Sequence, residues 1–245
     1  MITNNHWMQG STMKTIMFLA VILLLAAGTP ITYGASFDCA KAVTKVERLV
    51  CTDPQLSEMD SELDRSYGKA REMERLLNNK DRLREYQAAW LRDIRNRCPD
   101  MKCLKAVYEQ RIAQLKVPLQ PDNCAVADQG VMAAIGTCTG SELHMEEDYL
   151  SNLILILKKT QADSQILTFE KKQSAWRKNF ECHCLNKLYG YTAGNTGPAI
   201  VVGCELEEVK IRLAEVKKIL NGAPVNFGGN SPAPGSCQQQ EVKDQ

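Results

Sequence analysis

The sequence predicts an all-α protein made of two tandem, disulfide-stapled small helical bundles. One observation is an internal repeat, in which a set of landmarks recurs in the same order at offsets of 85 to 87 residues: Cys39, Cys51, Trp90 and Cys98, then Cys124, Cys138, Trp176 and Cys184. The other observation is that apolar residues recur with helical spacing, and no alternating run indicates a strand. Each copy is near the size at which a hydrophobic core alone is insufficient, so covalent staples are expected.

The first segment, residues 1–35, has the pattern of a secretory signal peptide. Lys14 precedes an apolar run from Ile16 to Ala27, and small residues around Gly34 and Ala35 offer a cleavage site. The apolar run is too short for a membrane span, which needs about 20 residues. We therefore expect the mature protein to be periplasmic or secreted, in a compartment where cysteines pair as disulfides.

The first unit, residues 36–120, is expected to hold helices connected by short turns. One apolar stripe has the spacing of an amphipathic helix: Leu56, Met59, Leu63, Tyr67 and Ala70. A short helix bearing Cys39 and Cys51 is expected before it, a second long helix over residues 80–97, and a third from about Met101. Two prolines, Pro118 and Pro121, mark the end of this unit.

The second unit, residues 121–222, repeats this order with a more divergent sequence. A further landmark pair, Cys103 and Arg111, recurs as Cys204 and Arg212 at an offset of 101 residues, so an insertion precedes it. The inserted stretch, residues 188–203, is rich in Gly, Thr and Asn and is expected to be a loop. Residues 223–245 are rich in Gly, Pro, Ser and Gln and are expected to be a flexible tail.

The repeat constrains how the ten cysteines pair, because a bridge used in one unit should be available in the other. Spacing alone does not determine the connectivity, but Cys39–Cys51 would bracket a short helix and its turn, and Cys98–Cys103 would clamp a helix hairpin. With their equivalents Cys124–Cys138 and Cys184–Cys204, these are the four pairs we expect. Two cysteines, Cys182 and Cys237, lie outside the repeat and are expected to pair with each other.

Little in the sequence indicates catalysis or cofactor binding. Two thiolates and an imidazole in Cys182-His183-Cys184 could bind copper or zinc, but disulfide pairing of both cysteines is the favoured interpretation. No nucleophile elbow, zinc-protease helix or phosphate loop is present, so we expect no catalytic residue, no cofactor and no metal site. The chain has 30 basic and 29 acidic residues, and it lacks the basic stripe of a nucleic-acid-binding protein.

A specific pattern of residues runs through the first unit: Phe37-Asp38-Cys39-Ala40-Lys41-Ala42, then Glu47, Cys51, Pro54, Leu56, Ser57, Met59, Asp60, Leu63 and Tyr67. It continues with Trp90-Leu91, Arg95, Cys98, Cys103-Leu104, Tyr108, Arg111-Ile112 and Leu115. This pattern resembles the LprI-like lysozyme-inhibitor domain family over residues 36–116. The second unit resembles a more divergent member, because it carries the Trp176-x7-Cys184 and Cys204-x7-Arg212 landmarks. It departs from the pattern after Cys138, where Glu147 and Leu150 stand in place of Asp60 and Leu63.

The resemblance implies a small exported helical protein that blocks an enzyme, since the type member of the family is described as an inhibitor of lysozyme. That member is a lipoprotein, whereas here Ser36-Phe37-Asp38 before Cys39 is not a lipid-attachment signal, so no stable membrane anchor is expected. The function expected is therefore that of a non-enzymatic, protein-binding module whose partner is a lysozyme. The alternatives are a periplasmic scaffolding protein without an enzyme target and, less favoured, a thiol- or copper-handling protein.

The inserted stretch, residues 188–203, is the candidate for partner contact. It contains Tyr189 and Tyr191, and such aromatic side chains are enriched at the energetic centres of interfaces. A Cys184–Cys204 bridge at its base would lower the entropy lost when the stretch is ordered on binding. The competing interpretation is an insertion tolerated in a surface loop.

Overall fold

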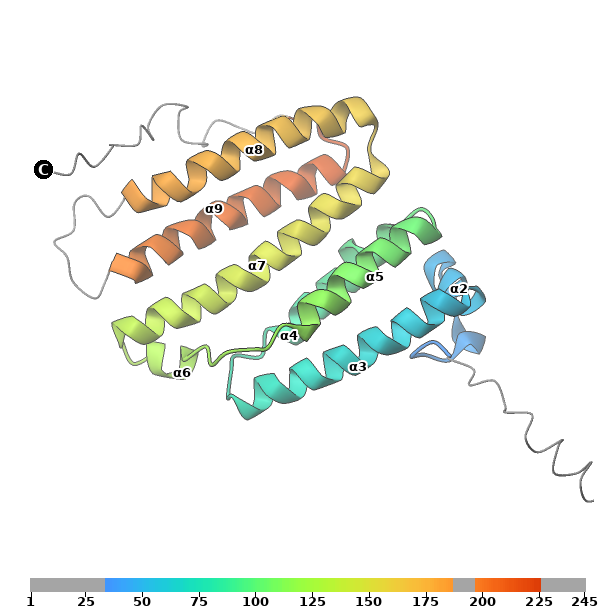
Figure 1. The fold of residues 1–245 in the computed structure, drawn as a ribbon, viewed down its shortest axis with the longest axis horizontal. Helices are drawn as coiled ribbons and strands as arrows, with labels where there is room; N and C mark the ends of the chain where they lie inside the picture. The colour runs from blue at the N-terminus through green and yellow to red at the C-terminus, as the bar shows by residue number, and fades with distance from the viewer. Residues whose placement is uncertain (1–33, 187–196, 226–245) are drawn as a thin grey trace, which may run out of the picture. The chain divides into compact units, whose positions relative to one another are not determined.

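The computed structural model describes residues 34–186 and 197–225, and every regular element in these two stretches is a helix (Figure 1). The predicted all-α fold is confirmed. The first unit contains η1 (Cys39–Lys41), α2 (Lys45–Thr52), α3 (Pro54–Leu76), α4 (Leu83–Asp93), η2 (Arg95–Arg97) and α5 (Met101–Lys116). The second unit contains α6 (Cys124–Ala127), α7 (Met132–Thr160), α8 (Asp163–Asn186) and α9 (Gly197–Leu220).

Local side-chain contacts fix where the helices of the first unit begin. At the start of α2, the Thr44 hydroxyl accepts from the Glu47 N–H at 3.1 Å, and the Glu47 carboxylate accepts from the Thr44 N–H at 2.9 Å. This reciprocal pair is a capping box. Asp53 caps α3 by accepting from Leu56 N–H at 2.8 Å, and Pro54 occupies the first helical position, where it removes no hydrogen bond.

Two expectations for the first unit were wrong in detail. Cys39 and Cys51 do not share a helix, because Cys39 lies in the short 3₁₀ turn η1 and Cys51 lies in α2. The helix expected over residues 80–97 begins at Leu83 and ends at Asp93, since Ile94 has φ −116° and ψ −72° and the chain continues as the 3₁₀ turn η2.

The second unit differs from expectation in its insertion. Helix α9 begins at Gly197, so residues 197–203 are helical rather than part of a loop. The cause is packing against α7: a side chain built at Gly136 of α7 would lie 3.8 Å from Ala199, and one built at Gly140 would lie 3.9 Å from Val202. Burial against a neighbouring helix therefore extends α9 beyond what its glycines alone would favour.

Four disulfides between described residues staple the two units, and each joins two cysteines of the same unit. The Cα atoms lie 5.8 Å apart in Cys39–Cys51, 5.4 Å in Cys98–Cys103, 4.7 Å in Cys124–Cys138 and 5.5 Å in Cys184–Cys204. These are the pairs that the repeat argument selects. Cys182 is also disulfide-bonded, but Cys237 lies outside the described residues, so their mutual pairing stays a prediction.

One hydrophobic core runs through both units. Helix α3 packs on α5 and α7 packs on α9, while α7 also contacts α4 and α5 across the unit boundary. Buried side chains of α5 and α7 belong to the same cluster, among them Leu104, Ile112, Leu150 and Leu153. The boundary at residue 120 is therefore a packed interface as well as a point where the repeat begins again.

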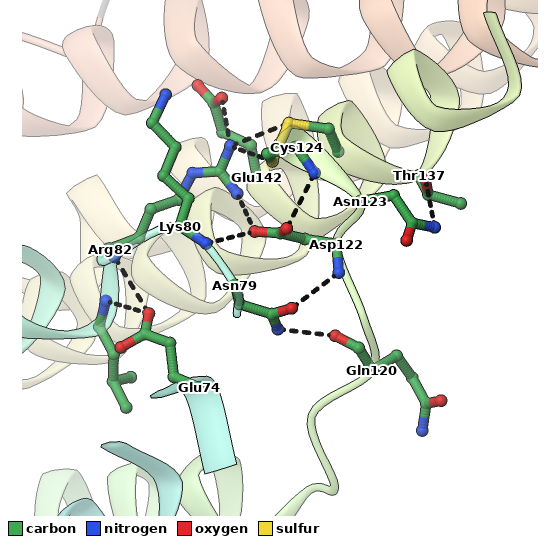
Figure 2. A network of polar contacts seen from close by, with 12 residues as sticks. Glu74, Asn79, Lys80, Arg82, Gln120, Asp122, Asn123, Cys124, Thr137 and Glu142 are labelled. Atoms are coloured by element: carbon green, nitrogen blue, oxygen red, sulfur yellow. Dashed lines mark hydrogen bonds and ion pairs between the residues drawn. A yellow bond between two sulfur atoms is a disulfide. The ribbon is translucent and has the colours of Figure 1, made fainter. Parts of the chain in front are cut away.

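A polar network fastens the segment between the units to the α3–α4 turn (Figure 2). The Asn79 amide donates to the Gln120 carbonyl at 2.8 Å and accepts from Asp122 N–H at 2.9 Å. Asp122 in turn accepts from Lys80 N–H at 2.8 Å and from Cys124 N–H at 3.0 Å, and it lies 3.5 Å from the Arg82 guanidinium. Because Asp122 is buried, these contacts fix the path of the chain between the units.

Candidate partner-binding site

The polar centre of the first unit is the buried carboxylate of Asp60. It accepts hydrogen bonds from the Tyr108 hydroxyl at 2.7 Å, from the Ser36 hydroxyl at 2.6 Å and from the Ser36 N–H at 2.8 Å. Burial raises the pKa of Tyr108, and the charge of Asp60 raises it further, so the hydroxyl stays a donor. Asp60 thereby ties the N-terminal segment and α5 to α3.

The tryptophans of the two units are core residues. Trp90 packs edge-to-face on Tyr108, with ring centroids 5.4 Å apart, and Trp176 stacks on Phe180 at 4.9 Å. All four side chains are buried. Several residues that carry the family resemblance thus lie inside the molecule, where they specify the fold and are not available to touch a partner.

The predicted contact residues Tyr189 and Tyr191 lie outside the described residues, as does most of the insertion around them. The structure does show the two helices that flank this insertion. The last turns of α8 and the first turns of α9 are joined by the buried Cys184–Cys204 bridge. This crosslink limits the distance between the end of α8 and the start of α9, which the insertion connects.

Large apolar side chains are exposed near these flanks. Leu185, which follows the bridge cysteine in α8, is 52% exposed. Val131, the N-cap of α7, and Met132, its first residue, are 45% and 39% exposed. They lie about one turn before Gly136, where α7 meets the first turns of α9. Leu185, Val131 and Met132 are thus exposed apolar side chains at the end of α8 and the start of α7.

Both cysteines of the Cys182-His183-Cys184 stretch are disulfide-bonded. Cys184 is bonded to Cys204, so its sulfur is not a free thiolate ligand. The His183 Nε2 atom lies 3.9 Å from a carboxylate oxygen of Glu208 in α9. Across residues 34–186 and 197–225, no three His, Cys, Asp or Glu side chains are grouped as metal ligands would be.

Sequence reasoning missed both the exposed apolar residues and the network at the unit boundary. Val131 and Met132 follow Gly130, which has a positive φ of 81°, so a turn between α6 and α7 could have been expected there. Nothing in the sequence marks Arg82 and Asp122 as partners, because they are 40 positions apart and on different units.

In the part of the chain that the structure describes, no helix is both long and apolar enough to cross a membrane.

Comparison with known proteins gives a family for the first unit. The family model described as lysozyme inhibitor LprI matches residues 38–115. Lipoprotein LprI of Mycobacterium bovis and lipoprotein LprI of Mycobacterium tuberculosis are each 32% identical to this chain over 111 residues, which cover 42% of this chain and 54% of the relative.

The chain therefore spans about half the length of these curated relatives. No solved structure matches it significantly. The family match ends at Leu115, one residue before α5 ends, so it does not include the second unit. Residues 38–115 are accordingly a domain of the lysozyme inhibitor LprI type.

Proposed function

We propose that this protein binds a lysozyme-type muramidase and inhibits it. The observation that carries the proposal is the match of residues 38–115 to the lysozyme inhibitor LprI family model. Lysozymes cleave the glycosidic bond with two carboxyl groups that flank it in a cleft. A protein that occupies this cleft blocks the reaction without catalytic residues of its own, so the inhibitor itself needs no enzymatic machinery.

We place the contact at the end of the second unit that carries the insertion. The Cys184–Cys204 bridge supports this position, because a segment closed by a crosslink loses less conformational entropy on binding. Exposed Leu185, in the last turn of α8 and three residues before the insertion begins, adds apolar surface there. The two tyrosines of the insertion would supply the central contacts, as aromatic residues do in many interfaces.

A turbidity assay tests inhibition directly. Purified protein is mixed with a lysozyme, and the clearing of a suspension of bacterial cell walls is followed with time. We expect the rate of clearing to fall as inhibitor is added, up to saturation at one equivalent. An unchanged rate with lysozymes of several structural classes would contradict the proposal and favour a scaffolding role.

Variants locate the contact surface. Replacing Tyr189 and Tyr191 together with alanine is expected to weaken inhibition by at least 10-fold, because truncating an interface centre costs about 2 kcal/mol or more. Leu185→Ala is expected to weaken it less. The matched control is Leu167→Ala, since Leu167 is 72% exposed near the other end of α8. Equal inhibition by the tyrosine double variant and the control would move the contact to the first unit.

We also propose that the protein acts outside the cytoplasm, in the periplasm or the medium. The signal-like segment and the disulfides support this location, because such bridges persist in oxidising compartments. N-terminal sequencing of protein recovered from the periplasm or medium is expected to begin at residue 35 or 36. Recovery of uncleaved chain from the cytoplasm alone would contradict it.

A further inference from the structure

A cavity of about 370 Å³ opens between the two units. Residues of α3, α4, α5, α7 and the connecting segment line it, and most of the lining is apolar, including Ala70, Leu83, Tyr86, Leu115, Val117 and Met145. The volume falls in the range of small-molecule sites. The exposed residues Pro118, Thr137 and His144 form part of its lining, so solvent reaches the cavity.

One charged side chain, Arg111 of α5, lines this cavity while being 6% exposed. Its Nε atom donates to Gln87 Oε1 at 3.0 Å, but its Nη2 atom is buried without a hydrogen-bond partner. Among the described residues, no carboxylate is in ion-pair contact with it. Burial lowers the pKa of Arg111 to about 10, so the guanidinium remains charged at neutral pH.

The internal repeat supplies a reference for this arginine. Arg212 of α9 is its counterpart and is 1% exposed. Its Nε atom donates to Gln173 Oε1 at 2.7 Å, and Gln173 lies 86 residues after Gln87, the offset that relates the two tryptophans. Both units therefore contain the same hydrogen bond, from a buried arginine to a glutamine.

The two copies differ in what neutralises the guanidinium. Arg212 is paired with Glu215, with Nη1 and Oε2 3.0 Å apart. The position equivalent to Glu215 in the first unit, 101 residues earlier, is the uncharged Gln114. Gln114 turns to α7 instead, where its amide nitrogen lies 3.2 Å from the Ser151 hydroxyl. The first unit thus keeps the buried cation and lacks the internal anion.

The nearest negative charge on the cavity wall is Asp148 of α7. It raises the pKa of Arg111 against the larger, opposite effect of burial, yet it forms no ion pair with the guanidinium. Its carboxylate lies 3.8 Å from His144 Nε2 on its own helix. An unpaired buried donor on a charged group costs free energy, so a bound acceptor at Arg111 Nη2 would be favoured.

We propose that this cavity is a binding site for a small organic monocarboxylate with an apolar body. The carboxylate accepts a hydrogen bond from Arg111 Nη2, in the role that Glu215 has for Arg212. The hydrocarbon part contacts Leu83, Leu115 and Met145. A charged acceptor is preferred over a neutral one because it adds the Coulomb attraction of an ion pair with the buried guanidinium to the hydrogen bond.

Isothermal titration calorimetry of the full chain with 4-phenylbutyrate tests the site, and its uncharged amide, 4-phenylbutanamide, is the matched probe. We expect the acid to bind at least 10-fold more tightly than the amide. Arg111→Gln is expected to weaken binding of the acid by at least 10-fold. Lys102→Gln removes the same charge from the exposed side of the same helix and should leave binding unchanged.

A second variant keeps the guanidinium and closes the cavity. Ser141→Phe adds a ring to a residue of the lining, so it is expected to abolish binding of both probes while Arg111 is intact. This variant decides the question if Arg111→Gln does not fold. Equal binding of acid and amide, undiminished binding by either variant, or no binding of the acid by the unmodified protein would overturn the proposal. No lysozyme is present in the titration, so its outcome is independent of inhibition.

Discussion

Replacing Asp122 with alanine tests whether the polar network at the unit boundary stabilises the fold. Asp122 is 2% exposed and meets three partners: the N–H groups of Lys80 and Cys124 and the guanidinium of Arg82. Alanine removes the acceptor from all three and leaves their positions unchanged. The side chain of Arg82 is itself 8% exposed, so its charge would stay buried.

The expected loss follows from these contacts. Removing one partner of a buried ion pair costs about 3–5 kcal/mol. Arg82 retains Glu142 at 3.4 Å, and Lys80 is exposed enough for water to replace its lost acceptor, so the low end applies. We expect a decrease of about 3 kcal/mol in the free energy of unfolding. For a slope near 3 kcal/mol per M urea, the midpoint would fall by about 1 M.

Urea unfolding followed by circular dichroism measures this midpoint, with Asp128→Ala as the control. Asp128 lies six positions away, at the end of α6, and its side chain is exposed. The control is expected to stay within about 0.5 kcal/mol of the unmodified protein. If Asp122→Ala behaves like Asp128→Ala, the network contributes nothing to stability and the reasoning is refuted.

Three further predictions concern the first unit. Tyr108→Phe removes the hydroxyl that donates to the buried Asp60, and urea unfolding should show a loss of about 1–3 kcal/mol; no loss would mean that water replaces the donor. Glu47→Gln weakens the capping box, in which hydrogen bonds from the N–H groups of Thr44 and Val43 lower the pKa of Glu47 in the folded state. The unmodified protein should therefore have the larger free energy of unfolding above the usual pKa of 4.5, and this difference should vanish as pH falls through the lowered pKa. A difference in free energy of unfolding that does not change with pH would contradict this. A fragment of residues 36–120 is expected to fold with both its disulfides but to unfold at a lower temperature than the full chain, since α7 no longer covers it; calorimetry showing no cooperative transition would mean that the units fold only together.

The sequence predicted the helical class and the buried faces of the long helices, but not all helix ends and not the contacts between units. The stripe from Leu56 to Ala70 predicted α3 because its spacing alone determines a buried face. The extension of α9 to Gly197 was missed because it depends on α7, more than 50 residues earlier in the chain. Local composition carries no information about such a neighbour.

The candidate sites show the same limit. Tyr189 and Tyr191 were selected by residue type, and their role stays a prediction. That Arg111 Nη2 is buried without a hydrogen-bond partner could be recognised only from geometry. The comparison of Gln114 with Glu215 was available in the sequence, and it acquires meaning once the buried guanidinium is located.

The short spans of the disulfides have a consequence for how the chain acquires its structure. The four described bridges join cysteines 5 to 20 positions apart, and each stays within one unit. Closing such small loops is fast and needs no distant segment. In a chain delivered N-terminus first into an oxidising compartment, the bridges of the first unit can form before the second unit arrives. Correct pairing among the eight cysteines of these bridges then depends on the order of emergence and needs little subsequent reshuffling.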